Sequence, residues 1–469
     1  MLRPGGGGPA RRPALARPSS RQSAWELLRA VWSDGAYANL VWPKILTRSG
    51  LTEQDRRFAT ELGYGTLRTS GQLREILARA SGSNPGRWQP EVLWVLQLGA
   101  YQLLHMRTPT HAAVNESVSL ARTVGVPRAS GLVNAVLRKV SVHSLDEWLE
   151  ALCREAKGET ACLAMAYAHP EWMVEELRHS LEREGRDSEI EALLSSHNTP
   201  ARVTAALLPG LAEPGEEEEE RTPYSPIGAY LQGDPSLDSR ITSAQARIQD
   251  EGSQLAALVA ARALPLQEGH RVLDMCSGPG GKAAVLLSES VAVGAYLTAL
   301  EVAPHRAELV KEALAGFGSD SPSEVLVADA TTFDGGPFDR IVIDAPCSGL
   351  GALRRRPEAR WTKEPGDLAA LRESQAALLN AGARLLADGG VLVYVTCSPV
   401  VSETTDPISA LLDQHPELEA LNTSELLDRV TRQDVPTAGV GTAVQLWPHR
   451  HGTDAMFIQV LRQRAEPTG

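Results

Sequence analysis

From residue 270 onward, short apolar, β-branched runs alternate with helical stretches. The runs cover residues 271–275, 297–301, 325–329, 338–344 and 391–397. Runs of this length that end at turn residues predict buried strands. Strands that alternate with helices predict parallel strands joined by crossovers. Two later apolar runs, 443–447 and 456–461, suit a closing antiparallel hairpin. We therefore expect a mostly parallel, seven-stranded, doubly wound α/β sheet.

The chain before this point has a helical pattern. Trp25–Trp32 has helical apolar spacing, and Thr52 followed by Asp55 resembles a capping box. Val92–Leu104 is apolar nearly all round, which predicts a central buried helix. Residues 22–141 are therefore expected to form a compact all-α unit. Further on, five consecutive glutamates at 216–220 lie among prolines and predict a solvated loop.

Composition limits the protein class. The chain has 469 residues, 43% of them hydrophobic and 22% charged, as in an ordinary globular protein. No stretch approaches the roughly 20 apolar residues of a membrane span, and the Arg-rich N-terminus lacks the apolar core of a secretory signal. Five cysteines are too few for a disulfide framework in a chain of this length. We therefore expect a cytoplasmic protein.

Charge is unevenly distributed along the chain. The net charge is −12, but residues 1–140 carry 19 Lys/Arg and 8 Asp/Glu, a balance of +11. The remainder therefore carries −23. Residues 1–21 supply five of the arginines and no acid, and without them the front balance is +6. A basic front on an acidic body favours a nucleic-acid-binding appendage.

Two cysteines follow two of the predicted strands. Cys347 lies in Asp344-Ala345-Pro346-Cys347-Ser348-Gly349, and Cys397 lies in Thr396-Cys397-Ser398. Ligands and chemistry in open α/β sheets lie outside the carboxyl ends of the strands. Two thiols at that edge suggest sulfur chemistry on a substrate. The alternatives are a disulfide, a metal site or two inert buried thiols, although neither thiol has a second Cys or His at ligand spacing.

A Gly-rich turn follows the first strand of the sheet, in Cys276-Ser277-Gly278-Pro279-Gly280-Gly281-Lys282. Such a turn lets backbone N–H groups approach a ligand at a helix N-terminus. Glu301 and Asp329 end the next two strands, where carboxylates suit ribose hydroxyls and an adenine amino group. With Asp344, these carboxylates disfavour a polyphosphate and tolerate a sulfonium. The expected cofactor is therefore S-adenosylmethionine rather than NAD or ATP.

A methyl donor beside thiols narrows the chemistry. C5 of a pyrimidine is a poor nucleophile until a thiolate adds to C6, and this covalent step makes methyl transfer to C5 feasible. Asp344, sharing a proton with N3, would stabilise the adduct. A paired base must also leave its stack. At this point either thiol could be the nucleophile.

These motifs resemble the RNA cytosine-C5 methyltransferases of the RsmB/Sun (Fmu) type. The resemblance covers residues 248–460 and is carried by Gly278–Lys282, the two cysteine motifs, Arg355–Trp361 and Ile248–Gln254. The front is similar to a NusB-like RNA-binding domain in Asp55–Phe58, Tyr64–Arg68 and Asn134–Lys139. That domain marks the branch that acts on bacterial small-subunit rRNA.

The resemblance implies a Rossmann-like class I methyltransferase domain at 248–464 and a NusB-like domain at 22–142. Residues 1–21 are expected to be a disordered tail, and 143–247 a linker or small RNA-binding subdomain. The implied reaction is methylation of C5 of a cytosine in 16S rRNA by a monomer that needs no metal or membrane. Two alternatives are the same reaction on tRNA and a NusB-like RNA-binding protein with a degenerate catalytic half.

The family also assigns roles to single residues. The thiol of the Thr-Cys-Ser motif attacks in this family, so Cys397 is the implied nucleophile and Cys347 assists product release. Lys282 and Asp344 complete the implied catalytic group. The implied cofactor-binding residues are Cys276, Ser277, Gly278, Pro279, Gly280, Gly281, Lys282, Glu301, Arg306, Asp329 and Asp344. Family members often have Ala where Gly278 stands, Thr where Ala283 stands and Glu-Asn-Glu where Glu403-Thr404-Thr405 stands.

A cluster of cations follows the Cys347 motif. It consists of Arg354, Arg355, Arg356, Arg360 and Lys363. Such cations can bind RNA phosphates beside a flipped cytosine, and the alternative is a solvated basic loop.

Overall fold

The computed structural model describes residues 18–213, 220–262, 264–436 and 439–464. The chain divides into two compact units between Glu155 and Ala156. Most of the predicted N-terminal tail and Glu216–Glu219 of the predicted acidic loop lie outside the described residues. Within the described ranges, every helix is too short or too polar to cross a membrane.

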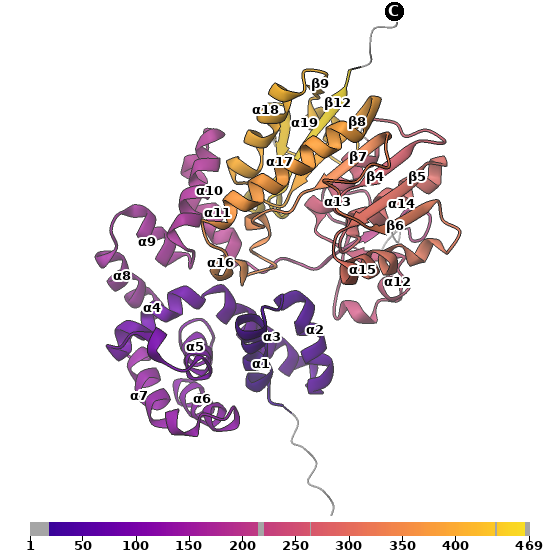
Figure 1. Ribbon diagram of the computed structural model, residues 1–469. Coiled ribbons are helices and arrows are strands. Elements are labelled where there is room, and N and C mark those ends of the chain that lie inside the picture. The colour runs from indigo at the N-terminus through magenta and orange to yellow at the C-terminus, as the bar shows by residue number, and fades with distance from the viewer. Residues whose placement is uncertain (1–17, 214–219, 263, 437–438, 465–469) are drawn as a thin grey trace, which may run out of the picture. The chain divides into compact units, whose positions relative to one another are not determined.

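The described residues of the first unit form helices joined by short connections, as predicted. Thr52 caps α3, because its hydroxyl accepts a hydrogen bond from Asp55 N. The apolar helix α5 is buried along most of its length and contacts α1, α3, α4, α6 and α7, which surround it in Figure 1. The helices are α1 (Ser20–Asp34), α2 (Ala38–Ser49), α3 (Glu53–Arg68), α4 (Ser70–Ser81), α5 (Pro90–Leu104), α6 (Thr110–Thr123), α7 (Ser130–Val140) and α8 (Leu145–Glu155).

The second unit begins with helices and a small antiparallel sheet. The helices are α9 (Glu159–Ala166), α10 (Glu171–Arg183), α11 (Ile190–Asn198) and α12 (Ser239–Thr242). The strands are β1 (Thr204–Leu207), β2 (Gly228–Tyr230) and β3 (Ala246–Ile248), in the order β2-β1-β3. Buried Glu251 ties this sheet to the next helix, since one of its carboxylate oxygens accepts hydrogen bonds from Tyr224 N and Ser225 N.

A large mixed sheet follows, in the order β10-β11-β12-β8-β7-β4-β5-β6, with β9 paired to β12. Five neighbouring strands from β8 to β6 are parallel, as the sequence predicts. β11 and β12 pair antiparallel, which confirms the predicted hairpin, and β12 also runs antiparallel to β8. In the described residues this large sheet has nine strands rather than seven, because β9 and β10 are too short to leave a sequence pattern. The strands are β4 (Arg271–Asp274), β5 (Tyr296–Glu301), β6 (Ser323–Val327), β7 (Phe338–Asp344), β8 (Leu386–Thr396), β9 (Leu418–Ala420), β10 (Gly439–Val440), β11 (Ala443–Gln445) and β12 (Phe457–Gln463).

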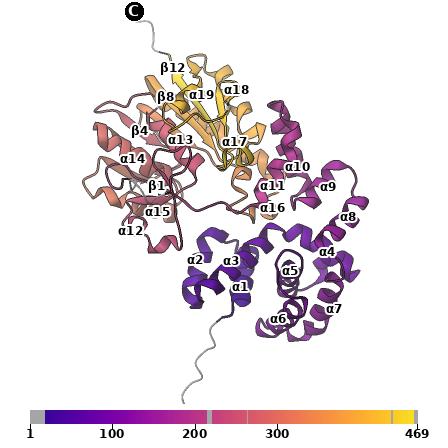
Figure 2. The ribbon, with the colours of Figure 1, turned by 180° about the vertical axis from the view of Figure 1, so that it is seen from behind.

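Helices cover both faces of this sheet, so its central strands are buried on both sides. Val393 and Val395 pack into one core with α13 and α14, whereas Leu392 and Tyr394 pack into another with α17 and α18. This period-two alternation is that of a strand between two helical layers. Figures 1 and 2 both show α17 running along the sheet beside β7 and β8. The helices are α13 (Glu251–Arg262), α14 (Gly281–Val293), α15 (Pro304–Leu314), α16 (Ala359–Thr362), α17 (Asp367–Leu385), α18 (Thr405–Gln414), α19 (Thr423–Asp428) and α20 (Pro448–His451).

Candidate active site

The two predicted thiols meet at the carboxyl edge of β7 and β8. Their Sγ atoms are 3.4 Å apart, and both cysteines are free and half-buried. Backbone hydrogen bonds hold the loops together, from Ala345 N to Val395 O (2.9 Å) and from Gly351 N to Cys397 O (2.9 Å). The two thiols are therefore in contact without being joined as a disulfide.

The other cysteines have different states. Cys276 is also a free thiol, at the Gly-rich turn, and burial raises its pKa above the ordinary value. Cys153 and Cys162 are half-buried and disulfide-bonded. The described residues contain no cluster of His, Cys, Asp or Glu placed to hold a metal ion.

The two thiols have unequal surroundings. The hydrogen bond with Cys347 lowers the pKa of Cys397, and the nearby Lys282 ammonium lowers it further, against burial and Asp344. The same hydrogen bond and burial raise the pKa of Cys347, and the Glu403 carboxylate adds to that rise. A thiolate is stabilised by neighbouring cations and donated hydrogen bonds. Cys397 is therefore the thiol with the more stable thiolate.

Lys282 and Asp344 form an ion pair beside the thiols. Lys282, from the first turn of α14, places Nζ 2.9 Å from Asp344 Oδ2 at the end of β7. Burial lowers the pKa of Lys282, but the Asp344 carboxylate outweighs it and the net pKa is raised. The ammonium therefore stays charged close to Cys397.

Asp274, which the sequence analysis did not select, lies at the same edge. It ends β4 and is fully buried, and burial together with Asp344 raises its pKa to about 7. Its Oδ1 accepts a hydrogen bond from Cys276 N, whereas Oδ2 has no hydrogen-bond partner among the described residues. A signal existed in the sequence, because Asp274 is the last polar residue of the predicted strand 271–275, much as Glu301 and Asp344 end theirs.

The Gly-rich turn packs closely against the β5 end. A Cβ on Gly278 would lie 2.2 Å from Glu301 Oε2 and 2.9 Å from the Arg306 guanidinium. Arg306 in turn lies 3.4 Å from Glu301 Oε2 and donates to Gly278 O at 2.7 Å. Gly280 has a φ of +100°, and a Cβ there would lie 2.4 Å from Ala313 Cβ. Glycine replaces the Ala that family members often have at position 278, and the Glu301–Arg306 pair occupies the space that the Ala methyl group would need.

Other predicted cofactor residues have local roles in this loop region. Ser277 N donates to Leu300 O (2.9 Å), and its hydroxyl donates to Asp274 O (3.0 Å), which fixes the turn to β4 and β5. Asp329 is exposed and lies two residues beyond the end of β6. Its carboxylate accepts hydrogen bonds from the Thr331 hydroxyl and N–H, which lower its pKa.

These groups fit the predicted cofactor. The unpartnered Asp274 Oδ2 is a buried acceptor that suits an ammonium group, since buried polar atoms require partners. Glu301 and Asp329 present acceptors for hydroxyl and amino donors at the ends of the neighbouring strands. An edge with four carboxylates opposes a polyphosphate and accommodates a cation.

The predicted RNA-binding cations divide into two groups. Arg354, Arg355, Arg356 and Lys363 are half-buried, and Arg355 forms an ion pair with buried Asp454. Arg360 is fully buried instead. Its guanidinium donates to Ala168 O (3.0 Å), Asn198 Oδ1 (2.7 Å) and His197 O (2.7 Å). The prediction that Arg360 contacts RNA is therefore wrong, because these distant acceptors bind its guanidinium inside the protein.

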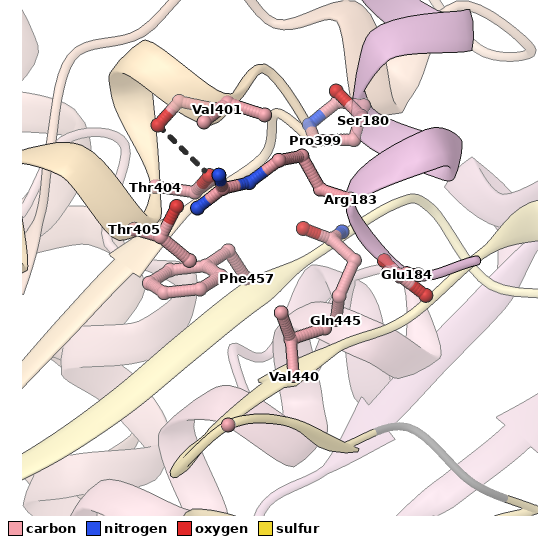
Figure 3. A pocket seen from close by; sticks show the side chains of 11 residues that line it. Ser180, Arg183, Glu184, Pro399, Val401, Thr404, Thr405, Val440, Gln445 and Phe457 are labelled. Atoms are coloured by element: carbon pink, nitrogen blue, oxygen red, sulfur yellow. Dashed lines mark hydrogen bonds between the residues drawn. The ribbon is translucent and has the colours of Figure 1, made fainter.

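A separate cavity of about 300 Å³ lies behind the Cys397 loop (Figure 3). Pro399 and Phe457 contribute its apolar wall, and the exposed Arg183 side chain of α10 extends toward Thr404. None of the predicted thiol, lysine or cofactor residues lines it. The reactive groups lie along the sheet edge and not in this cavity.

Two known protein families match the two parts of the chain. Residues 261–462 match the family model for the 16S rRNA methyltransferase RsmB/F, and residues 18–142 match the NusB family. A Mycobacterium tuberculosis protein, whose name, methyltransferase Rv1407, states no substrate, is 41% identical and covers 97% of this chain and 98% of its own. Ribosomal RNA small subunit methyltransferase B of Pseudomonas syringae is 33% identical, over 84% of this chain and 86% of its own.

Solved structures share the fold. The crystal structure of PH0851 has a TM-score of 0.79 at 20% identity and covers 96% of this chain and all of that one. The structure of NSun6 from Pyrococcus horikoshii with SFG has a TM-score of 0.52 at 18% identity, over 62% of this chain and 98% of that one. The solved structures show the fold, whereas the sequence identity of the relatives over most of the chain also shows the family. This protein belongs to the RsmB/F family of 16S rRNA methyltransferases and carries a NusB-family domain in its first part.

Proposed function

We propose that this protein transfers a methyl group from S-adenosylmethionine to C5 of a cytosine in 16S rRNA through a covalent cysteine–C6 adduct. The observation that carries the proposal is the contact between two free thiols, 3.4 Å apart, next to the Lys282–Asp344 pair. Methylation that needed no thiol would give no reason for two cysteines at this edge. The names of the relatives support rRNA as the substrate.

Cys397 is the nucleophile in this proposal. Its thiolate adds to C6, and the electron pair of the C5=C6 bond then makes C5 nucleophilic. In this proposal Cys347 keeps its proton and donates it in the hydrogen bond between the two sulfurs, which keeps the attacking sulfur oriented. After methyl transfer has left S-adenosylhomocysteine, the C5 proton passes to solvent, the C–H electron pair re-forms the C5=C6 bond, and the S–C6 bond breaks with its electrons returning to the Cys397 sulfur. Cys347 assists this release, because it lies in contact with the departing sulfur.

The other residues hold the two reactants. Asp344 and Lys282 face the N3/N4 edge of the cytosine, where they stabilise the charge that forms on the ring. S-adenosylmethionine, when bound, supplies the methyl group. Asp274, Glu301 and Asp329 bind its donor groups, and the Gly278–Lys282 turn contacts it through the backbone.

RNA binding divides between two regions. Arg354, Arg355, Arg356 and Lys363, close to the Cys347 loop, contact phosphates near the flipped cytosine. The NusB-family domain adds contacts to rRNA shape.

Bisulfite sequencing of 16S rRNA from a deletion strain tests the reaction. One 5-methylcytosine should disappear, return with the wild-type gene and stay absent with Cys397→Ala. An unchanged 16S rRNA pattern would contradict the proposal. If a tRNA site is lost instead, tRNA is the substrate.

Trapping of a covalent RNA adduct tests the thiol roles. Cys347→Ala should accumulate the adduct because release fails, whereas Cys397→Ala and the double variant should form none. Denaturing gels with labelled RNA detect it. Adduct formation by Cys397→Ala would reverse the two roles.

A further inference from the structure

A buried carboxylate connects the two thiol loops. Glu403, at the end of the short helix η7 (Val401–Glu403), is fully buried beneath them. Its Oε1 accepts a hydrogen bond from Ser348 N at 2.7 Å. Its Oε2 accepts from the Ser348 and Ser398 hydroxyls, each at 2.6 Å. Ser348 follows Cys347 and Ser398 follows Cys397, so one side chain binds the neighbour of each thiol.

The backbone of Glu403 is itself fixed. Its carbonyl accepts a hydrogen bond from the Tyr394 hydroxyl of β8 at 3.0 Å, and its N–H donates to Val400 O at 2.8 Å. Gln375 of α17 adds a weaker donor to Oε1 at 3.4 Å and also donates to Pro346 O at 2.9 Å. Hydrogen bonds to a charged acceptor are about twice as strong as neutral ones. Glu403 is therefore held at one position relative to both loops.

Burying this carboxylate costs free energy of desolvation, which apolar contacts between the two loops would not. Replacing a buried ionic group by apolar side chains is often neutral or stabilising in proteins. Two small apolar residues could pack the loops together without a charge. The carboxylate lies next to the Cys347 loop and the Lys282 ammonium next to Cys397, so the pair of thiols lies between charges of opposite sign.

We propose that Glu403 is a positioning residue that orders the two thiols. It holds the Cys347 S–H toward the Cys397 sulfur and opposes a negative charge on Cys347, so that Cys397 alone becomes the attacking thiolate. The role of Glu403 in catalysis rests on the proposed function. The order in which the two thiols ionise can be measured in the free protein, without RNA.

Other titratable and charged groups also lie near Glu403 and the thiols. Glu176 of α10 and Tyr394 also face the Glu403 side, and burial raises the pKa of both. Asp344 and Asp454 face Cys397 and oppose its ionisation, while Lys282 favours it. Among the groups that act on Cys347, Glu403 is the carboxylate that raises its pKa.

Alkylation of the free protein tests this order. Wild-type protein without RNA is treated with iodoacetamide across a pH series, and peptide mass mapping measures the labelling of each thiol. Glu403→Gln keeps the size of the side chain and removes its charge. We expect the preference for Cys397 over Cys347 to fall about tenfold, the effect of one pKa unit. Labelling of Cys397 should also require higher pH, because its ordered donor is lost.

A matched control is Glu184→Gln. Glu184 is a second carboxylate of the same unit, half-buried and bonded to Trp447 Nε1 at 3.0 Å and not to either thiol loop. This variant should keep the wild-type preference. If Glu403→Gln misfolds by circular dichroism, Ser398→Ala removes one tie with less disturbance and should shift the preference in the same direction.

The outcomes separate this inference from the proposed function. An unchanged thiol preference in Glu403→Gln overturns the inference, even if turnover falls, since a merely structural role would give that result. A lost preference with unchanged binding of S-adenosylhomocysteine supports it. If wild-type protein forms no 5-methylcytosine in any RNA, the proposed function fails, while the alkylation result still decides whether Glu403 orders the thiols.

Discussion

Replacing Gly351 with alanine tests how closely the two thiol loops must approach. Gly351 N donates to Cys397 O, and Gly351 O accepts from Ala455 N at 3.0 Å, so this residue lies between two backbone segments. A Cβ would lie 2.0 Å from Ala455 O and 2.7 Å from Cys397 O. Neither is a flexible side chain. Restoring an ordinary contact of 3.4 Å requires a backbone displacement of about 1.4 Å.

That displacement is large compared with the 3.4 Å contact between the thiols. A misplacement of about 1 Å costs about 100-fold in rate, so single-turnover methylation of 16S rRNA should fall by about that factor. Overpacking should cost about 1–3 kcal/mol of stability, measured by urea unfolding. Gly366→Ala is the control, because a Cβ there meets no atom within 4 Å. A Gly351→Ala rate close to the wild-type rate would refute the requirement for close approach.

Three further predictions follow from charge and burial. Lys282→Met should shift the pH–rate profile to higher pH, because Cys397 loses the cation that lowers its pKa; an unshifted profile would contradict this. Arg360→Met should lower stability by about 3 kcal/mol without changing the salt dependence of RNA binding, measured by melting and filter binding. Burial lowers the pKa of His169 and His197 below the ordinary value of 6.5, so both are neutral in the folded protein at a pH where the unfolded chain already protonates them. The unfolded chain therefore gains protons as the pH falls through 6.5, and Tm, followed by thermal melting, should fall between pH 7 and 5.

Local sequence patterns predicted the elements of the sheet well. β7 begins and ends at the predicted residues, Phe338–Asp344, because the alternation of buried side chains and the turn after the strand are properties of adjacent residues. The polar residue that ends a strand lies at the carboxyl edge whatever the rest of the fold does. This is why Asp344, Cys347 and Cys397 could be placed at one edge in advance.

Roles that depend on distant contacts were not predictable in this way. Arg360 and Lys363 are three residues apart in a basic segment, yet Arg360 is buried by acceptors up to 192 residues away in the sequence. No local pattern distinguishes a cation that binds such acceptors from one that faces solvent. Whether Arg360 faces solvent depends on the packing of α11 against α16, and this packing exists only in the folded chain.

The same distinction holds for the two thiols. Their motifs give both of them a strand end, a following serine and a place at the sheet edge, and those features are equal because they are local. The inequality comes from Lys282 of α14 on one side and Glu403 of η7 on the other. Glu403 is 55 residues from Ser348 along the chain and 2.7 Å from its N–H in the fold. Electrostatic effects depend on distance in space, so the difference between the thiols arises only when the folded chain brings these charges beside them.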